Sequence, residues 1–404
     1  MAKRSGGDLA LDSVDILLRE RRYPEALGRL RDIDPALLSD PEAAGRYYIQ
    51  LTHARIYSDQ QDPYDDSEIR AALDALRYNV RSPMFAQCKL FLGLLQFKRG
   101  EFTEAIESLT EANVLFRGAS DRESMARALN LMGCASMEKG QFSSGLQALV
   151  EAHSLFNEVS DGKGALDVFH NLTNYCLKFG RISEAYLRFK DYETELSASG
   201  IKSSFQFSAN MAWLLGIRGE FEAARKFLTK AFDCIEGDAR NSAYYWQTAG
   251  KLAEAEADYD HALENYTLGL NIAEEIDSDL RWGLRRHKAD ILVRLGRVDE
   301  AEEHIGEAQS SAEAGRDRTE VAACNRTLGM IGASRGLDQV ARRYFKKALD
   351  LFEGIDSRWE MAQTRLLAAE MVSGLTEQEK ADLEKAAHQY LDDEGLPLTQ
   401  VKKV

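Results

Sequence analysis

The chain has 404 residues, of which 44% are hydrophobic and 29% are charged, a composition too apolar for wholesale disorder. Its 66 Asp and Glu against 51 Lys and Arg give a formal net charge of −15, which disfavours non-specific nucleic-acid binding because displacing counterions from phosphates requires a cationic surface. No apolar run approaches the roughly 18 residues of a membrane span, no signal-peptide core follows Lys3 and Arg4, and scattered cysteines fit a reducing cytoplasm.

The first fifth of the chain has the pattern of divergent helical hairpins. Three apolar residues share one face at helical spacing: Tyr23, Ala26 and Leu30. Two further helices are expected near 42–58 and 67–80, with a loop over 59–66 between them. We therefore predict divergent repeat units over residues 8–83.

A repeated pattern dominates the rest of the chain, where residues 84–396 contain no proline to interrupt a helix. In each copy, a small anchor residue is followed by apolar residues that share one helical face. Seven copies begin, at steps of 38 to 40 residues, at Gly100, Gly140, Gly180, Gly219, Ala257, Gly296 and Gly336. Glycine at the anchor is expected to end one helix by adopting a positive φ, so that a second helix can follow.

A second small residue precedes each anchor by seven positions, where it allows two helices to cross closely. These residues are Gly93, Gly133, Thr173, Ala212, Gly250, Ala289 and Gly329. Each unit is therefore predicted to be a helix, a tight turn and a second helix. Ser120 with Glu123, and Ser357 with Glu360, have the spacing of a capping box and predict helix starts.

The recurring small, aromatic and alanine positions resemble the tetratricopeptide repeat (TPR) family. The units are longer than the usual roughly 34 residues, as in the long-unit subgroup of bacterial signalling and regulatory proteins. The resemblance implies an all-α fold, a right-handed α-solenoid of about nine helical hairpins with a C-terminal capping helix. We assign seven clear units to residues 84–374, the polar capping helix to 375–395 and a tail to 396–404.

No group of residues in the sequence predicts catalysis. The sequence lacks the phosphate-binding, serine-nucleophile and zinc-protease motifs, and its seven histidines never have metal-ligand spacing with one another. Cys134 and Cys176 fall on first helices, where a nucleophile is one interpretation and a small packing residue is the favoured one. We expect no enzymatic activity, no cofactor and no metal.

The resemblance implies that the first helices line a concave groove and that certain positions on them face inward. Carried onto this chain, these positions give a predicted partner-binding set: Lys98, Arg127, Asn130, His170, Asn174, Lys178, Gln206, Trp213, Tyr244, Gln247, Lys251, Arg286 and Arg326. Across the seven clear units, seven Lys or Arg and four Asp or Glu occupy inward positions, so the groove is predicted to be net positive. Side-chain amides there suit an extended peptide backbone, because they donate and accept hydrogen bonds.

The leading hypothesis is a non-catalytic scaffold that binds a protein or peptide, with an acidic partner favoured by the predicted groove charge. The alternative is a sensory or regulatory module of a bacterial transcription or signal-transduction system, which would change its superhelix on binding a ligand or partner. RNA binding through helical repeats is disfavoured by the acidic charge, and a hidden hydrolase ranks last. The sequence indicates no membrane association and leaves self-association open.

Overall fold

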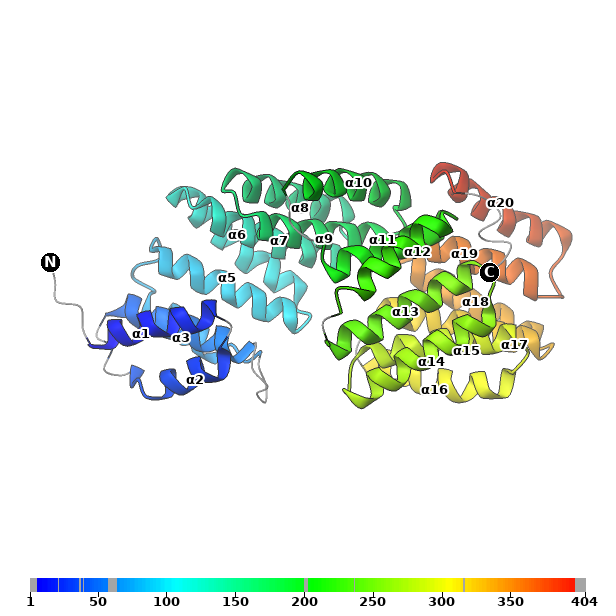
Figure 1. The fold of residues 1–404 in the computed structure, drawn as a ribbon, viewed down its shortest axis with the longest axis horizontal. Coiled ribbons are helices and arrows are strands. Elements are labelled where there is room, and N and C mark those ends of the chain that lie inside the picture. Colours follow the sequence, from blue (N-terminus) through cyan, green and yellow to red (C-terminus); the bar gives the residue numbers. More distant parts are fainter. Residues whose placement is uncertain are drawn as a thin grey trace. The chain divides into compact units, whose positions relative to one another are not determined.

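The computed structural model describes residues 6–20, 22–35, 38, 40–56, 64–199, 203–235, 237–314 and 317–396. Over these residues the regular structure is α-helical, without strands, and the chain divides into two compact units (Figure 1). Unit 1 is residues 1–172 and unit 2 is residues 173–404, with the boundary inside α9. No described helix is long and apolar enough to cross a bilayer.

The helices follow one another in pairs. Those that begin in unit 1 are α1 (Gly6–Arg19), α2 (Tyr23–Arg31), α3 (Pro41–Ile56), α4 (Ser67–Ala75), α5 (Pro83–Lys98), α6 (Phe102–Ala119), α7 (Arg122–Glu138), α8 (Phe142–Glu158) and α9 (Gly162–Lys178). Those of unit 2 are α10 (Ile182–Ser199), α11 (Phe205–Ile217), α12 (Phe221–Phe232), α13 (Ala239–Ala255), α14 (Tyr259–Glu275), α15 (Leu280–Arg294), α16 (Val298–Ala314), α17 (Arg318–Ser334), α18 (Asp338–Glu353), α19 (Arg358–Met371) and α20 (Glu377–Asp393).

Packing between the helices defines a solenoid in each unit. Consecutive helices pack against each other, as α5 does with α6 and α13 with α14 (Figure 1). First helices also contact the first helix of the next hairpin, as α5 does with α7, α11 with α13 and α15 with α17. This pattern of nearest-neighbour and next-nearest contacts confirms the predicted all-α solenoid. Its right-handed twist stays a prediction.

The turn inside each of the seven clear units is closed by a residue in the left-handed conformation. At the first clear unit, the Glu101 N–H donates to the Gln96 carbonyl at 2.9 Å and the Gly100 N–H donates to the Phe97 carbonyl at 3.0 Å. This double hydrogen bond is a Schellman motif, which needs a positive φ at its penultimate residue. The predicted anchors with positive φ are Gly100, Gly140, Gly180, Gly219, Ala257, Gly296 and Gly336.

The glycines among the small residues seven positions before the anchors lie where two helices cross, as predicted. A Cβ added at Gly93 would lie 2.5 Å from Cγ of Leu109, and one added at Gly250 would lie 2.4 Å from Cε1 of Tyr266. Each large side chain of the second helix therefore packs directly on the backbone of the first. The interior between the two helices leaves no room for another methyl group.

Both predicted capping boxes are wrong. Ser120 adopts a φ of 58° and closes α6, so Asp121 becomes the N-cap of α7 and accepts a hydrogen bond from the Ser124 N–H at 3.1 Å. Ser357 is the N-cap of α19, but its hydroxyl makes no capping hydrogen bond. A capping box forms instead at the start of α20, between Thr376 and Glu379.

The polar capping helix assigned to residues 375–395 corresponds to α20, and it packs against α19, so the solenoid of unit 2 ends in a helical pair. The predicted domain limits at 83, 374 and 395 stay a prediction. Of the predicted tail, residues 397–404 lie outside the described residues, as do residues 59–63 of the predicted N-terminal loop.

Candidate functional site

Unit 2 contains a cavity of about 660 Å³, a size in the range of small-ligand sites. Its walls come mainly from the first helices of successive hairpins: α9, α11, α13, α15, α17 and α19. The TPR-like expectation that first helices face inward therefore holds for this cavity. Eight residues of the predicted binding set line it: Asn174, Lys178, Trp213, Tyr244, Gln247, Lys251, Arg286 and Arg326.

The other five predicted residues do not line this cavity. Gln206 lies on α11 but is exposed and makes only a long hydrogen bond to Asn241. The remaining four belong to unit 1: Lys98, Arg127, Asn130 and His170. Among them, Lys98 and Arg127 are exposed, Asn130 accepts a hydrogen bond from Asn171 at 2.9 Å, and burial lowers the pKa of His170.

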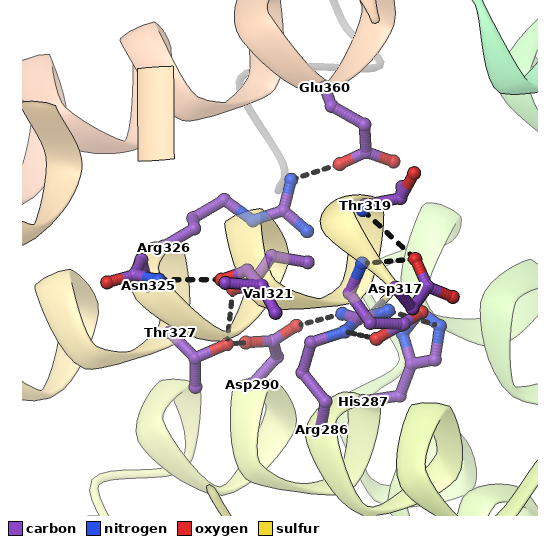
Figure 2. Close-up of polar contacts among 12 residues, drawn as sticks. Arg286, His287, Asp290, Asp317, Thr319, Val321, Asn325, Arg326, Thr327 and Glu360 are labelled. Atoms are coloured by element: carbon purple, nitrogen blue, oxygen red, sulfur yellow. Dashed lines mark hydrogen bonds and ion pairs between the residues drawn. The ribbon is translucent and has the colours of Figure 1, made fainter. Parts of the chain in front are cut away.

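An ion triad of Arg286, Asp290 and Glu320 lines the cavity, and Figure 2 shows the pairing of Arg286 with Asp290. The Arg286 Nη1 donates to Asp290 Oδ2 at 2.9 Å, and its Nε donates to Glu320 Oε2 at 2.8 Å. The Thr327 hydroxyl donates to the other oxygen of Asp290 at 2.5 Å. Only 6% of the Arg286 side chain is exposed, so its charge depends on these two carboxylates for compensation.

The shifted pKa values of Arg286 and Glu320 show that each residue stabilises the charged form of the other. Burial alone would raise the pKa of Glu320, but attraction to Arg286 and its hydrogen bond outweigh burial and lower that pKa. Likewise, burial opposes the charge on Arg286, while Glu320 and Asp290 outweigh it and raise the Arg286 pKa well above its usual value. The triad therefore links α15 to α17 by charge pairing in which Arg286 and Asp290 are buried and Glu320 is partly exposed.

A second buried group beside the triad is held in its neutral form. The His287 ring stacks on Tyr266 with centroids 5.0 Å apart, and the Tyr266 hydroxyl donates to Glu254 Oε2 at 2.7 Å. Burial, and then the charge of Arg286, lower the pKa of His287 well below its usual range. Burial, and then Asp290, raise the pKa of Glu254. His287 is thus a neutral hydrogen-bonding group whose Nε2 lies 3.0 Å from Arg286 Nη2.

Lys251 presents a cationic amine over an aromatic ring at the cavity surface. Its Nζ lies 4.4 Å from the centroid of the Trp213 ring, close enough for a cation–π interaction. Within the described residues, no carboxylate lies within ion-pair distance of this amine. Burial, and then repulsion from Arg286, lower the pKa of Lys251.

Amides and a phenol form a hydrogen-bonded chain along three successive first helices. The Asn210 amide donates to Asn174 Oδ1 at 2.5 Å, and the Tyr244 hydroxyl donates to Asn210 Oδ1 at 3.0 Å. Burial raises the pKa of Tyr244 to about 12, so its hydroxyl stays protonated and remains a donor. These groups give the α9–α11–α13 wall hydrogen-bonding capacity without charge.

Comparisons with known proteins agree with this architecture. Residues 282–354 match the family model described as Tetratricopeptide repeat. Residues 282–354 contain tetratricopeptide repeats. The predicted resemblance to TPR proteins is therefore confirmed, although no curated protein sequence matches the chain.

Three solved structures share the fold of this TPR chain at low sequence identity. A Rap protein complexed with competence and sporulation factor is 14% identical, with a TM-score of 0.56 over 98% of this chain and 99% of that one. The Rap conjugation gene regulator of the plasmid pLS20, in complex with the Phr* peptide, is 17% identical, with a TM-score of 0.52 over 86% and 95%. The apo quorum sensor NprR from B. thuringiensis is 14% identical, with a TM-score of 0.50 over 95% and 97%.

The predicted excess of positive charge is wrong for the cavity of this TPR unit. Four Lys or Arg and six Asp or Glu line it, so its formal charge is −2. Four of the carboxylates come from positions outside the predicted inward set: Asp279, Asp317, Glu320 and Glu360. Two of them neutralise buried arginines, since Glu320 pairs with Arg286 and Glu360 pairs with Arg326.

Several residues that line the cavity were not included in the inward positions predicted from the TPR resemblance. Asn210 lies three residues before Trp213, and Glu360 lies three before Gln363. Residues three apart on a helix share a face. Extending the inward face by one turn toward the start of α19 would have found Glu360, whereas Asn210 lies between the predicted positions Gln206 and Trp213 and needed the residue three before Trp213 to be included.

Two features of the described residues bear on the predicted absence of catalysis: their groups of metal-binding side chains and their cysteines. No cluster of three or more His, Cys, Asp or Glu side chains in this part of the chain is placed to hold a metal ion. Cys134 and Cys176 are buried, and burial raises the pKa of Cys176 to about 12, which keeps that thiol protonated. A protonated buried thiol is a packing residue rather than a nucleophile.

Proposed function

We propose that unit 2 is a non-catalytic receptor that binds a short peptide in its cavity. The observation that carries the proposal is that six successive first helices converge on one cavity that presents amides, aromatic rings and an amine. Such a surface can bind a peptide backbone and a small number of side chains at once. The Rap regulator of pLS20, which shares this fold, was solved with a peptide, and this supports the same ligand class.

Each wall of the cavity suits a different part of a peptide. The α9–α11–α13 wall, with Asn174 and Gln247, offers amides to main-chain N–H and C=O groups. Lys251 offers an amine that no described carboxylate approaches within ion-pair distance. Trp213 and Trp282 offer apolar faces for side chains. The paired arginines hold the cavity walls together rather than supplying free charge.

A regulatory role is the second candidate. Two of the solved relatives are described as a conjugation gene regulator and a quorum sensor, which favours a module that reports a bound peptide to a partner. The described residues contain no catalytic arrangement through which such a signal could act directly. The output would then pass through a change in the shape of unit 2.

Affinity selection from synthetic random hexapeptide pools tests the proposal. Retained peptides are identified by mass spectrometry, and their affinities are measured by tryptophan fluorescence, because three of the four tryptophans line the cavity. Gln247→Ala removes an amide from the cavity wall, whereas Gln206→Ala removes an exposed amide outside it.

We expect Gln247→Ala to lower the affinity for a retained peptide about tenfold, which corresponds to the loss of one hydrogen bond in a desolvated site. Gln206→Ala should leave that affinity unchanged. Retention of no peptide, or equal affinities in the two variants, would contradict peptide binding in this cavity.

A further inference from the structure

Unit 2 closes on itself at a contact between segments far apart in the sequence. The turn between α9 and α10 meets the start of α19 and the end of α20. The Ser357 hydroxyl donates to the Lys178 carbonyl at 2.9 Å, and the Tyr390 hydroxyl donates to the Gly180 carbonyl at 2.7 Å. The partners in these two hydrogen bonds are separated by 179 and 210 residues. The first and last hairpins of unit 2 are therefore joined directly.

The end of α20 also caps the start of α10. The Ser183 N–H, one of the amides that a helix start leaves without an internal partner, donates to Glu394 Oε2 at 2.7 Å. The Ser183 hydroxyl donates to the Glu394 carbonyl at 2.6 Å. A carboxylate at this position is stabilised by the positive end of the helix dipole. An ion pair between Arg181 and Asp356 at 3.1 Å adds to the contact.

Close backbone approach makes glycine necessary at the centre of this contact. A Cβ added at Gly180 would lie 2.3 Å from the backbone nitrogen of Trp359. The equivalent turn glycine between α15 and α16, Gly296, has a similar positive φ, yet a Cβ there would meet nothing within 4 Å. Gly180 therefore has a role at the contact that the hairpin turn alone does not demand.

This junction differs in chemistry from the others in unit 2. The stack of α15, α17 and α19 buries a continuous apolar cluster that includes Leu292, Met330 and Leu367. At the closing contact the described interactions include hydrogen bonds and an ion pair, beside the buried aromatic pair of Trp359 and Tyr390. Polar contacts can be exchanged for water at small net cost, whereas apolar burial cannot. The closing contact is thus where the ring of unit 2 can open.

The same residues belong to the closing contact and to the cavity. Trp359 packs against Gly180 and also lines the cavity, and Glu360 and Gln363 of the same helix form the cavity wall. On the opposite side, Lys178 lines the cavity while its carbonyl accepts the Ser357 hydrogen bond. Closure therefore sets the separation between the α9 and α19 walls.

We propose that this contact is a releasable latch, and that closure of the latch and occupancy of the cavity favour one another. A peptide that touches both the α9 and the α19 wall binds the closed ring better than the open one, which shifts the ring toward closure. The coupling rests on the proposed function, whereas the latch itself does not.

Hydrogen exchange measured by mass spectrometry on the full chain tests the latch without any ligand. Gly180→Ala places a methyl group against the Trp359 backbone, and Gly296→Ala is the matched control with the same positive-φ cost. We expect Gly180→Ala to speed exchange about tenfold or more in segments 178–184, 356–360 and 390–396 together, and Gly296→Ala to leave all three unchanged. Faster exchange confined to the residues around 180, or no change, would overturn the latch.

A second pair of variants covers the case in which Gly180→Ala does not fold. Glu394→Ala removes the carboxylate that caps α10, and Asp392→Ala removes an exposed carboxylate from the same end of α20. We expect only Glu394→Ala to accelerate exchange in segment 178–184 and to increase acrylamide quenching of tryptophan, because opening uncovers Trp359, which is 6% exposed. Equal quenching and equal exchange in the two variants would overturn the latch.

The coupling is tested with the hexapeptide retained in the Gln247 experiment. We expect it to bind Gly180→Ala about tenfold more weakly than Gly296→Ala. Equal affinities would overturn the coupling. If no hexapeptide is retained, the proposed function and the coupling fall together, while the exchange result still decides whether the latch exists.

Discussion

Units 1 and 2 use the same hairpin, yet their inward-facing charges differ in role. In unit 1, Arg127 is exposed and pairs, among the described residues, with Glu123 on its own helix, at 2.5 Å. In unit 2, Arg286 is buried and pairs with Glu320 on the next first helix. The repeat pattern sets the backbone and the apolar packing in both units. Whether an inward arginine becomes part of the structure depends on a carboxylate supplied by the neighbouring hairpin.

The largest expected effect separates these two arginines. Arg286→Met would leave the buried Asp290 and the partly exposed Glu320 without their counter-charge, and we expect it to lower the free energy of unfolding by about 3–5 kcal/mol. Arg127→Met removes an exposed ion pair and should change that free energy by less than about 1 kcal/mol. Urea denaturation followed by circular dichroism measures both. Similar losses of unfolding free energy in the two variants would show that the triad contributes no more to stability than a surface ion pair.

A second test asks whether the helix crossings of the two units are equivalent. Gly93→Ala and Gly250→Ala each place a methyl group inside a contact shorter than 3.0 Å, and we expect each to destabilise the chain by about 1–3 kcal/mol through overpacking. The loss should be larger at Gly250, because the displaced Tyr266 also holds Glu254.

Two helical glycines in open surroundings serve as controls for these substitutions. They are Gly118 in unit 1 and Gly306 in unit 2, where an added methyl group would meet nothing within 4 Å. Their replacement by alanine should stabilise the chain by up to about 1 kcal/mol, since alanine favours the helix. If the crossing and control glycines respond alike in thermal unfolding, helix propensity rather than close packing explains the small residues.

The local parts of this fold could be predicted from the sequence because their causes are local. An anchor glycine such as Gly100 indicates a positive φ at its own position. A small residue such as Gly93 indicates that a second helix packs closely against that position. Recurrence of both at a fixed interval then implies stacking. The same reasoning placed eight of the thirteen predicted binding residues on one cavity.

The closure of unit 2 could not be predicted in this way. Where the last hairpin meets the first depends on small rotations added over many repeats, and no single unit encodes that sum. Ser357 illustrates the difference. Its local spacing to Glu360 predicts a capping box, but its hydroxyl donates across the ring to Lys178. The charge of the cavity was mispredicted for a related reason. Glu320 and Glu360 each pair with an arginine of the preceding hairpin, which the pattern within one unit does not show.

A pH test separates buried from exposed histidines in unit 2. The pKa of His287 is lowered on folding, so below a pH of about 6.5 the unfolded chain binds a proton that the folded chain does not. Stability therefore falls with acidification through this window, by up to about 1.4 kcal/mol per pH unit from this one group. Unfolding curves at several pH values should show that His287→Gln removes this contribution.

His261 provides the control for the pH test, with the opposite sign. Its pKa is raised by its hydrogen bond to Asp258, so its stabilising contribution is present at acidic pH and is lost as the pH rises through the raised pKa. His261→Gln should therefore lower the free energy of unfolding slightly, and only at acidic pH. A change of the same sign in both variants would contradict the assignment of a neutral, buried His287.

The smallest expected effect lies at the one clear hairpin turn whose anchor is not glycine. Ala257 adopts a φ of 60° and makes the same turn hydrogen bond as the glycines, from its N–H to the Glu254 carbonyl at 2.9 Å. A left-handed alanine costs about 1 kcal/mol relative to glycine, so Ala257→Gly should raise the free energy of unfolding by about that amount. Gly296→Ala should lower it similarly, because a Cβ there meets only open space. Thermal unfolding of the two variants measures the turn alone. A loss of stability in Ala257→Gly would mean that packing of the alanine methyl group stabilises this turn. The turns at Gly100 and Gly140 of unit 1 have no such side-chain contribution.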